Sequence, residues 1–294
     1  MMNTARLKID RSSLRERMQR TQLPVLPPGT PYLLKAMADD DIGFRELSSI
    51  VEKFPSIAAR LIFLANSTWS SPAVEVTSIE MACARLGFFV VRSVSVALSI
   101  ASIFDARRCP AFDQTRYWAD ALLTADIAAT LDGEAGLEEA IDVQSARTAG
   151  LLHNLGLLWQ ATWMPEETHR ALSLADGEET GAPGIDSLLE EECGIGFCEA
   201  GALLAEAWKF SPLLIDALRY QQETGYADHH WEAANLIGVA RLLIRSREED
   251  ATGLCPDPRI ERLGITPDCQ QQILERIDSR SQEIRELART LFSA

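Results

Sequence analysis

An imidazole and a carboxamide stand side by side in an otherwise apolar stretch near the middle of the chain. Residues 150–158 read Gly-Leu-Leu-His-Asn-Leu-Gly-Leu-Leu, so His153 and Asn154 are its only polar side chains. An imidazole can bind a metal ion or move a proton near neutral pH. Two interpretations are therefore open. The pair is hydrogen-bonded within a helical core, or it belongs to a functional site.

The residues around this pair predict a buried helix, which we expect over residues 146–162. A helix that is apolar on all sides is enclosed by other helices. Gly150 and Gly156 each cost about 1 kcal/mol of helix propensity relative to alanine. That cost is understandable if neighbouring helices approach closely at these two positions.

Other patterns that carry chemistry are weak. The chain has no Gly-x-Ser-x-Gly, Walker or Gly-x-Gly-x-x-Gly motif, and its four histidines are too scattered to place three on one helix face. None of the six cysteines forms a Cys-x-x-Cys pair, and no signal-peptide pattern opens the chain. We therefore expect reduced thiols in a cytoplasmic protein.

A polar loop that contains Asn66, Ser67 and Trp69 is a second candidate for function. A tryptophan beside short polar side chains in a loop can be an exposed recognition point for a partner. Alternatively, Trp69 folds back and covers the N-terminal helices.

Apolar residues recur at helical spacing along most of the chain, without a convincing alternating strand. Pro31, Pro212 and Pro267 each follow a Ser or Thr, as at a capped helix start. Thr77 and Glu80 fit a capping box, and Gly87 is a natural helix end. The apolar run from Leu86 to Phe104 contains an arginine and four serines, which favours a core helix over a membrane span. The sequence predicts an all-α protein of about a dozen helices.

Composition limits the choice of partner. The 294 residues are 47% hydrophobic and 24% charged, with a formal net charge of -15, which argues against nucleic acid or an anionic membrane as the main partner. Residues 1–35 differ, because they carry seven Lys or Arg and two Asp or Glu. We interpret residues 1–22 as a basic leader that is solvated or docks on the acidic body or on a partner.

The order of several short motifs resembles the HD-related output domain (HDOD) family, a branch of the HD phosphohydrolase superfamily. The motifs are Leu23–Pro28, Ile50–Pro55, Ala59–Ser67, Ile79–Gly87 with Val91-Arg92, Gly150–Leu158, Glu199-Ala200-Gly201, Trp208–Pro212 and Leu218-Arg219-Tyr220. The resemblance implies an HD-like helical bundle with a smaller N-terminal helical sub-bundle. We expect this domain over residues 23–245, with sub-bundles at about 23–108 and 109–245, and residues 246–294 as a helical extension packed on it.

HD phosphohydrolases share a metal-binding set of a His, a His-Asp pair and a later Asp. The resemblance implies that these positions fall at about Asp120, at His153-Asn154 and near Arg241. Where catalytic relatives often have a further His, this chain has Cys198 and the pair Gln221-Gln222. Asn154 is neutral, and an arginine would repel a metal cation. We therefore expect a vestigial HD site with no catalytic residue, no metal and no cofactor.

The resemblance then implies a non-catalytic bacterial signal-transduction or scaffold module that acts through protein–protein contacts. Its relatives are often joined to receiver domains or to cyclic-di-GMP enzymes. A partner such as a response regulator or a cyclic-di-GMP enzyme is the expectation, in two-component or cyclic-di-GMP signalling. The alternatives are a divergent HD-type metal-dependent phosphohydrolase or phosphodiesterase, and a small-nucleotide-binding module.

Overall fold

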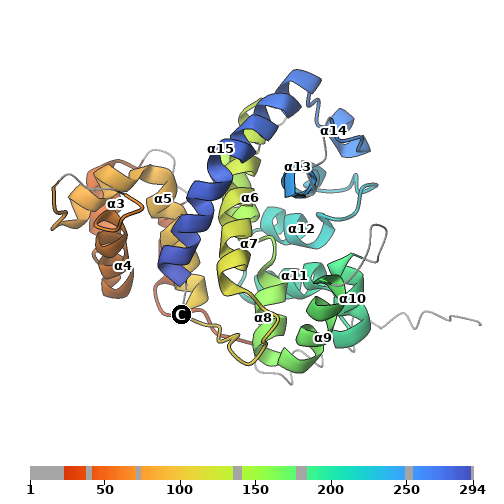
Figure 1. Ribbon diagram of the computed structural model, residues 1–294, viewed down its shortest axis with the longest axis horizontal. Coiled ribbons are helices and arrows are strands. Elements are labelled where there is room, and N and C mark those ends of the chain that lie inside the picture. Colours follow the sequence, from red (N-terminus) through yellow and green to blue (C-terminus); the bar gives the residue numbers. More distant parts are fainter. Residues whose placement is uncertain are drawn as a thin grey trace, which may run out of the picture.

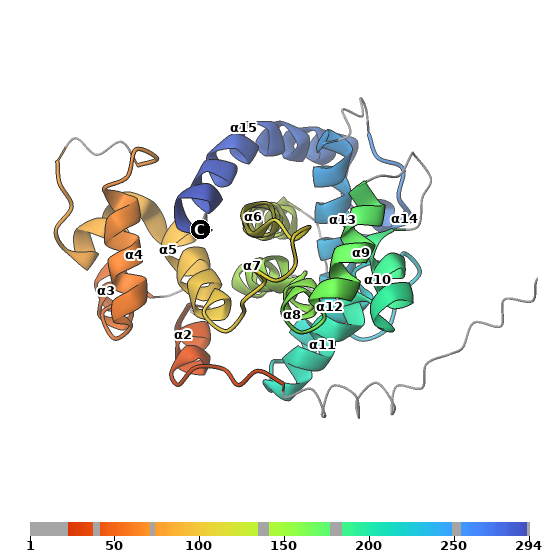
Figure 2. The ribbon, with the colours of Figure 1, turned by 60° about the horizontal axis from the view of Figure 1, so that its bottom comes forward.

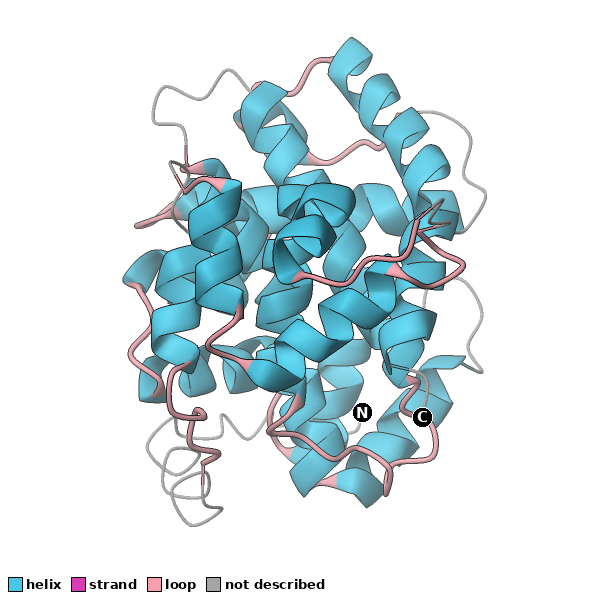
Figure 3. Ribbon diagram, turned by 90° about the vertical axis from the view of Figure 1, so that its left-hand side faces the viewer, coloured by secondary structure: helices cyan, strands magenta, loops and turns pink. Residues whose placement is uncertain are grey.

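The computed structural model describes residues 23–37, 42–70, 74–134, 141–176, 184–248 and 254–292. Within these ranges every regular element is a helix (Figure 3), which confirms the all-α prediction. The basic leader predicted at residues 1–22 lies outside the described residues.

A smaller group of helices lies at one end of the molecule (Figure 1). It consists of α2 (Thr30–Met37), α3 (Phe44–Val51), α4 (Pro55–Ala65) and α5 (Ile79–Ala101). Pro55 occupies the first turn of α4, where its missing N–H costs no hydrogen bond. Helices α2, α3 and α4 all pack on α5, so this long helix is the central helix of the sub-bundle.

Helix α5 is bent at Gly87, whose φ of 78° and ψ of 165° leave the helical region. The predicted helix end at Gly87 is thus confirmed, and a second helical segment starts at Phe88. The cap prediction is wrong by one residue. Ser78, not Thr77, caps the helix, because its side chain accepts a hydrogen bond of 3.2 Å from the Met81 N–H.

By length and composition α5 could cross a membrane, yet 61% of its most apolar window is buried inside the fold. Arg92 lies within this window at only 4% exposure, with its guanidinium 5.3 Å from the centre of the Phe88 ring. Both observations fit the predicted core helix.

The larger group of helices surrounds α6 (Gln114–Glu134) and α7 (Val143–Leu152). Figure 2 shows these two near the centre, with α5, α8, α13 and α15 around them. The remaining helices are α8 (Leu155–Trp163), α9 (Pro165–Asp176), α10 (Ile185–Cys193), α11 (Phe197–Ala207), α12 (Pro212–Tyr220), α13 (Trp231–Glu248), α14 (Pro258–Arg262) and α15 (Pro267–Phe292). The sequence pattern predicted neither α9 nor the short α14.

The single helix predicted over residues 146–162 is wrong, because the chain turns between α7 and α8. Asn154 has φ −106° and ψ 18°, outside the regular helix. Each half packs against a different neighbour. A Cβ atom on Gly150 would lie 2.8 Å from Ala125 Cα in α6, and one on Gly156 would lie 2.5 Å from Gly201 N in α11. The predicted close approaches are confirmed, and they are made to two different neighbouring helices, α6 and α11.

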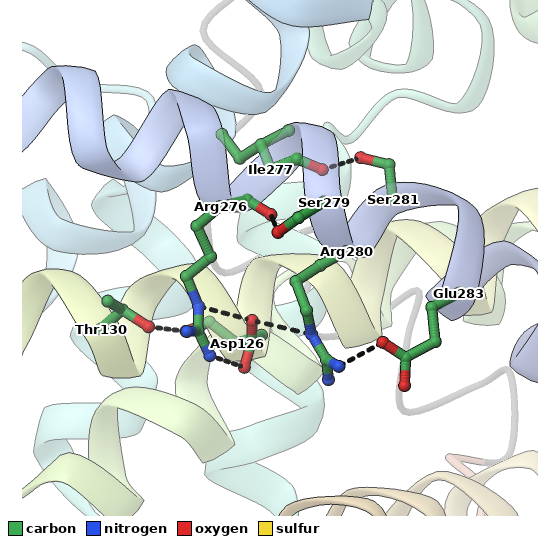
Figure 4. A network of polar contacts seen from close by, with 8 residues as sticks. All are labelled: Asp126, Thr130, Arg276, Ile277, Ser279, Arg280, Ser281 and Glu283. Atoms are coloured by element: carbon green, nitrogen blue, oxygen red, sulfur yellow. Dashed lines mark hydrogen bonds and ion pairs between the residues drawn. The ribbon is translucent and has the colours of Figure 1, made fainter.

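Helix α15 lies along α6 and also contacts α13 and α4 (Figure 1). Arg276 donates two hydrogen bonds, of 2.9 and 2.8 Å, to the buried carboxylate of Asp126 in α6 (Figure 4). Arg280 Nε lies 3.7 Å from the same carboxylate, and the Phe292 ring stacks on Trp118 at 4.8 Å. Polar and apolar contacts thus hold this helix on the larger bundle.

Candidate functional site

The centre of the larger bundle brings His153 and Asp120 together. His153 is the C-cap residue directly after α7, and its imidazole is fully buried. Nδ1 lies 2.7 Å from the Gly150 carbonyl oxygen, which can only accept, so Nδ1 carries a hydrogen. Nε2 faces Asp120 Oδ2 at 3.4 Å but is not aligned for a hydrogen bond. The pair is an ion pair whenever the imidazole is protonated.

Asp120 lies on α6 with 40% of its side chain exposed. Desolvation acts to raise the pKa of its carboxyl group, but the His153 imidazole and the positive charges of Arg241 and Arg116 outweigh it. The pKa of Asp120 is therefore lowered from its ordinary value. The carboxyl group is held as a carboxylate.

Gln221, at the end of α12, joins this pair to a third helix. It is 1% exposed, and its Nε2 donates 2.7 Å to the His153 carbonyl oxygen and 2.9 Å to that of Leu218. Its Oε1 accepts a 3.3 Å hydrogen bond from Arg241 on α13. Arg259 donates 2.8 Å to the Gln221 main-chain oxygen. Gln221 is thus the connecting residue, a role that the sequence pattern did not predict.

Arg241 places a positive charge beside the other predicted positions. Its guanidinium lies 5.3 Å from the centre of the Phe197 ring, and its charge acts on Asp120, Asp186 and Cys198. Asp186 Oδ1 accepts a 3.0 Å hydrogen bond from the Cys198 N–H. Desolvation raises the pKa of Asp186, although hydrogen bonds from Cys198 and the positive charge of Arg241 act to lower it. Desolvation by burial also raises the pKa of the Cys198 thiol.

The structure therefore brings together Asp120, His153, Cys198 and Arg241. Asn154 follows His153 and is 4% exposed. Within the described residues, neither Asn154 Oδ1 nor His153 Nε2 has a hydrogen-bond partner. Such buried atoms are usually paired with protein or with ordered water.

The loop at Asn66, Ser67 and Trp69 turns its polar groups inward. The Asn66 amide donates 2.7 Å to the Val76 carbonyl oxygen and accepts 2.8 Å from the Val76 N–H. Ser67 donates to the Leu64 carbonyl oxygen. Trp69 Nε1 donates 3.0 Å to the Glu283 carbonyl oxygen in α15. The hydrogen bond of Trp69 is thus with α15, whereas the alternative placed this residue over the N-terminal helices. The recognition role of the loop stays a prediction.

Residues 23–224 match the model of the HDOD domain. The chain belongs to the HDOD family. The predicted resemblance is thus confirmed, although the match ends before residue 245, where we placed the domain boundary. The boundary at residue 245 stays a prediction.

Solved structures share this HDOD fold. A Marinobacter aquaeolei VT8 protein, named for a proposed signal-transduction role, has a TM-score of 0.79 and 23% identity, covering 95% of this chain and 61% of that one. A Geobacter sulfurreducens HDOD domain protein of unknown function has a TM-score of 0.71 and 22% identity, covering 96% and 98%. A Shewanella amazonensis SB2B protein, named for a proposed phosphohydrolase activity, has a TM-score of 0.68 and 23% identity, covering 95% and 98%.

An uncharacterised protein of Treponema pallidum (strain Nichols) is 22% identical over 228 residues, or 76% of this HDOD chain. The chain spans 42% of the length of that relative and 61% of the Marinobacter chain.

The residues at the HDOD centre fit a divalent metal ion poorly. Asp120 and His153 would offer one carboxylate and one imidazole, whereas Asn154 offers a neutral amide. Arg241 adds a positive charge that acts on the same carboxylate, and this charge opposes a second cation. Across the described ranges, no three His, Cys, Asp or Glu side chains form a metal-binding group.

Proposed function

We propose that this HDOD protein is a non-catalytic bacterial signal-transduction or scaffold module. The observation that supports the proposal is the guanidinium of Arg241, which is bonded to Gln221 and acts on Asp120 from within the remnant HD centre. Hydrolysis by HD enzymes depends on a metal-bound water, and a fixed positive charge at this place disfavours the metal.

The test combines metal analysis with an activity panel. Purified protein is loaded with Mn²⁺, Mg²⁺ or Zn²⁺, dialysed, analysed for bound metal, and assayed on linear and cyclic nucleotides. We expect substoichiometric metal and no turnover above the His153→Ala variant. Stoichiometric metal together with turnover that His153→Ala abolishes would contradict the proposal.

We further propose that the module acts in the cytoplasm on a protein partner, such as a response regulator or a cyclic-di-GMP enzyme. Support comes from the family and from the signalling role proposed in the name of the Marinobacter structure. The net charge of -15 disfavours nucleic acid and anionic membranes as alternatives. Purified receiver domains and cyclic-di-GMP enzymes of the source organism can be titrated against the protein by interferometry. Saturable binding to one class is expected, and the absence of binding to both would contradict this proposal.

A second candidate function is binding or hydrolysis of a small nucleotide. Asn154 Oδ1 favours it, because this buried atom has no hydrogen-bond partner among the described residues and a bound ligand could supply one. A thermal-shift panel of nucleotides separates it from the first. A ligand at 100 times its Kd stabilises the folded state by roughly 2.7 kcal/mol, so a binder gives a clear rise in Tm. If no nucleotide raises Tm, this second function is contradicted.

A further inference from the structure

Two groups contact one guanidinium at the HDOD centre, the Gln221 amide oxygen and the Phe197 ring. The charge of this guanidinium, which belongs to Arg241, also acts to lower the pKa values of the Asp120 and Asp186 carboxyl groups against the effect of desolvation. We propose that Arg241 is the structural cation of this centre and supplies the positive charge that a metal ion supplies in catalytic HD proteins. The inference deepens the proposed function, because it states why the bundle remains assembled without a metal.

Contacts on two sides fix the guanidinium. One side lies over the Phe197 ring at 5.3 Å, a distance suited to a cation–π contact. The other donates 3.3 Å to Gln221 Oε1. Gln221 is itself held by the His153 carbonyl oxygen and by Arg259. The cation therefore links α13 to α11 and α12, and through Gln221 to the end of α7.

The neighbouring cations are less able to take this role. Arg259 makes two hydrogen bonds of 2.9 Å to the Asp257 carboxylate, which already balances its charge. Arg116 lies on the exposed side of α6, where water screens its charge. Without Arg241, Asp120 would keep His153 as its close partner, but Asp186 would lose the positive charge that stabilises its carboxylate. Carboxylates in a partly desolvated place would then destabilise the bundle.

A charge-specific series of variants tests the inference. Arg241→Met keeps much of the apolar stem over Phe197 but removes the charge, whereas Arg241→Lys keeps the charge. The matched control is Arg245→Met, one turn further along α13 and exposed. We expect Arg241→Met to lower Tm by roughly 4 °C or more, Arg241→Lys to recover at least half of that loss, and Arg245→Met to stay within about 1 °C of wild type. If the Met and Lys variants at position 241 have the same Tm, or if the Tm of Arg241→Met equals that of the Arg245→Met control, the inference is wrong.

A second arm asks whether a metal can replace the guanidinium. The double variant Asn154→Asp/Arg241→Asp removes the positive charge and adds two carboxylates beside His153. At 1 mM Mn²⁺ we expect its Tm to rise by about 5 °C if this concentration exceeds Kd a hundredfold, with no rise for wild type. If the double variant folds but its Tm does not rise with Mn²⁺, a metal ion cannot take the place of the guanidinium, and the proposed equivalence is wrong.

If the double variant does not fold, the comparison of Lys and Met at position 241 still decides whether Arg241 acts through its charge. The outcomes also separate the two proposals. Nucleotide turnover by the wild type would overturn the proposed function, whereas equal stability of the Met and Lys variants would overturn this inference alone.

Discussion

At the scale of single residues, Gly156 sets how closely α8 approaches α11. A methyl group there would lie 2.5 Å from Gly201 N and would overlap the Phe197 carbonyl oxygen. Both are main-chain atoms that cannot move aside without shifting a helix. We therefore expect Gly156→Ala to lower the free energy of unfolding by about 3 kcal/mol, measured by urea titration. Gly133→Ala is the control, because a methyl group meets nothing within 4 Å there and alanine should stabilise α6 by up to about 1 kcal/mol. Equal effects at both positions would contradict the packing argument.

Another single residue, Asp132 in α6, should make stability depend on pH. Its side chain is 4% exposed, and desolvation raises its pKa from the ordinary 3.8 to about 6. A hydrogen bond from the Ile141 N–H acts to lower this pKa, and the negative charge of Asp142 acts to raise it. Because the folded-state pKa lies above the unfolded one, the folded protein binds the extra proton between about pH 4 and pH 6. The contribution of Asp132 to stability therefore falls as pH rises through this window, by up to about 3 kcal/mol.

Asp132→Asn removes this titration, so the variant should gain stability relative to wild type as pH rises from 4 to 7. Urea unfolding at several pH values measures the difference. A constant difference between the two proteins across this range would show that Asp132 titrates normally.

At the scale of elements, the contact of α6 with α15 depends on the buried carboxylate of Asp126. Its side chain is 4% exposed and accepts two hydrogen bonds from Arg276 (Figure 4). Removing one partner of a buried pair costs about 3–5 kcal/mol. Because Arg276 is 41% exposed and water can reach it, we expect Asp126→Asn to cost about 2 kcal/mol in urea unfolding.

The matched control for this contact is Asp278→Asn, which breaks an ion pair of α15 with Arg247 at the surface. Its side chain is 49% exposed, so the loss should stay below about 1 kcal/mol. If the control costs as much as Asp126→Asn, burial is not what makes the α6–α15 pair important.

At the scale of the whole molecule, we expect the folding unit to extend beyond the region matched to the HDOD family. Helix α15 lies beyond residue 224 and buries seven large apolar side chains, Ile273, Leu274, Ile277, Ile284, Leu287, Leu291 and Phe292. At about 1.5–3 kcal/mol for each side chain, the free energy gained by their burial is comparable with the net stability of about 5–15 kcal/mol that is typical of a protein.

A chain that ends at residue 264 should therefore lose cooperative thermal unfolding by circular dichroism, although it contains the matched region. A peptide of residues 265–294 added in trans should restore it. Cooperative melting of the shortened chain near the full-length Tm would show that α15 is dispensable.

Much of the local structure could be predicted because its causes are local. Ser or Thr followed by Pro marked helix starts, and Gly87 marked the bend in α5. The break at His153-Asn154 was not predictable in this way, since the sequence there reads as one continuous apolar helix. Helix α9 was missed as well, because most of its residues 165–176 are polar.

Helical periodicity and side-chain polarity along the chain were enough to predict the helical class and the buried character of residues 150–158. The loss of the metal-binding set, inferred from ligand chemistry at the family positions, stays a prediction. Three features became visible from the packing of the helices alone. The chain turns at Asn154, Gln221 joins His153 to Arg241 by hydrogen bonds, and Trp69 donates a hydrogen bond to α15. Each of these depends on how helices distant in sequence pack together, and the arginine gains its role only from the carboxylates that packing places around it.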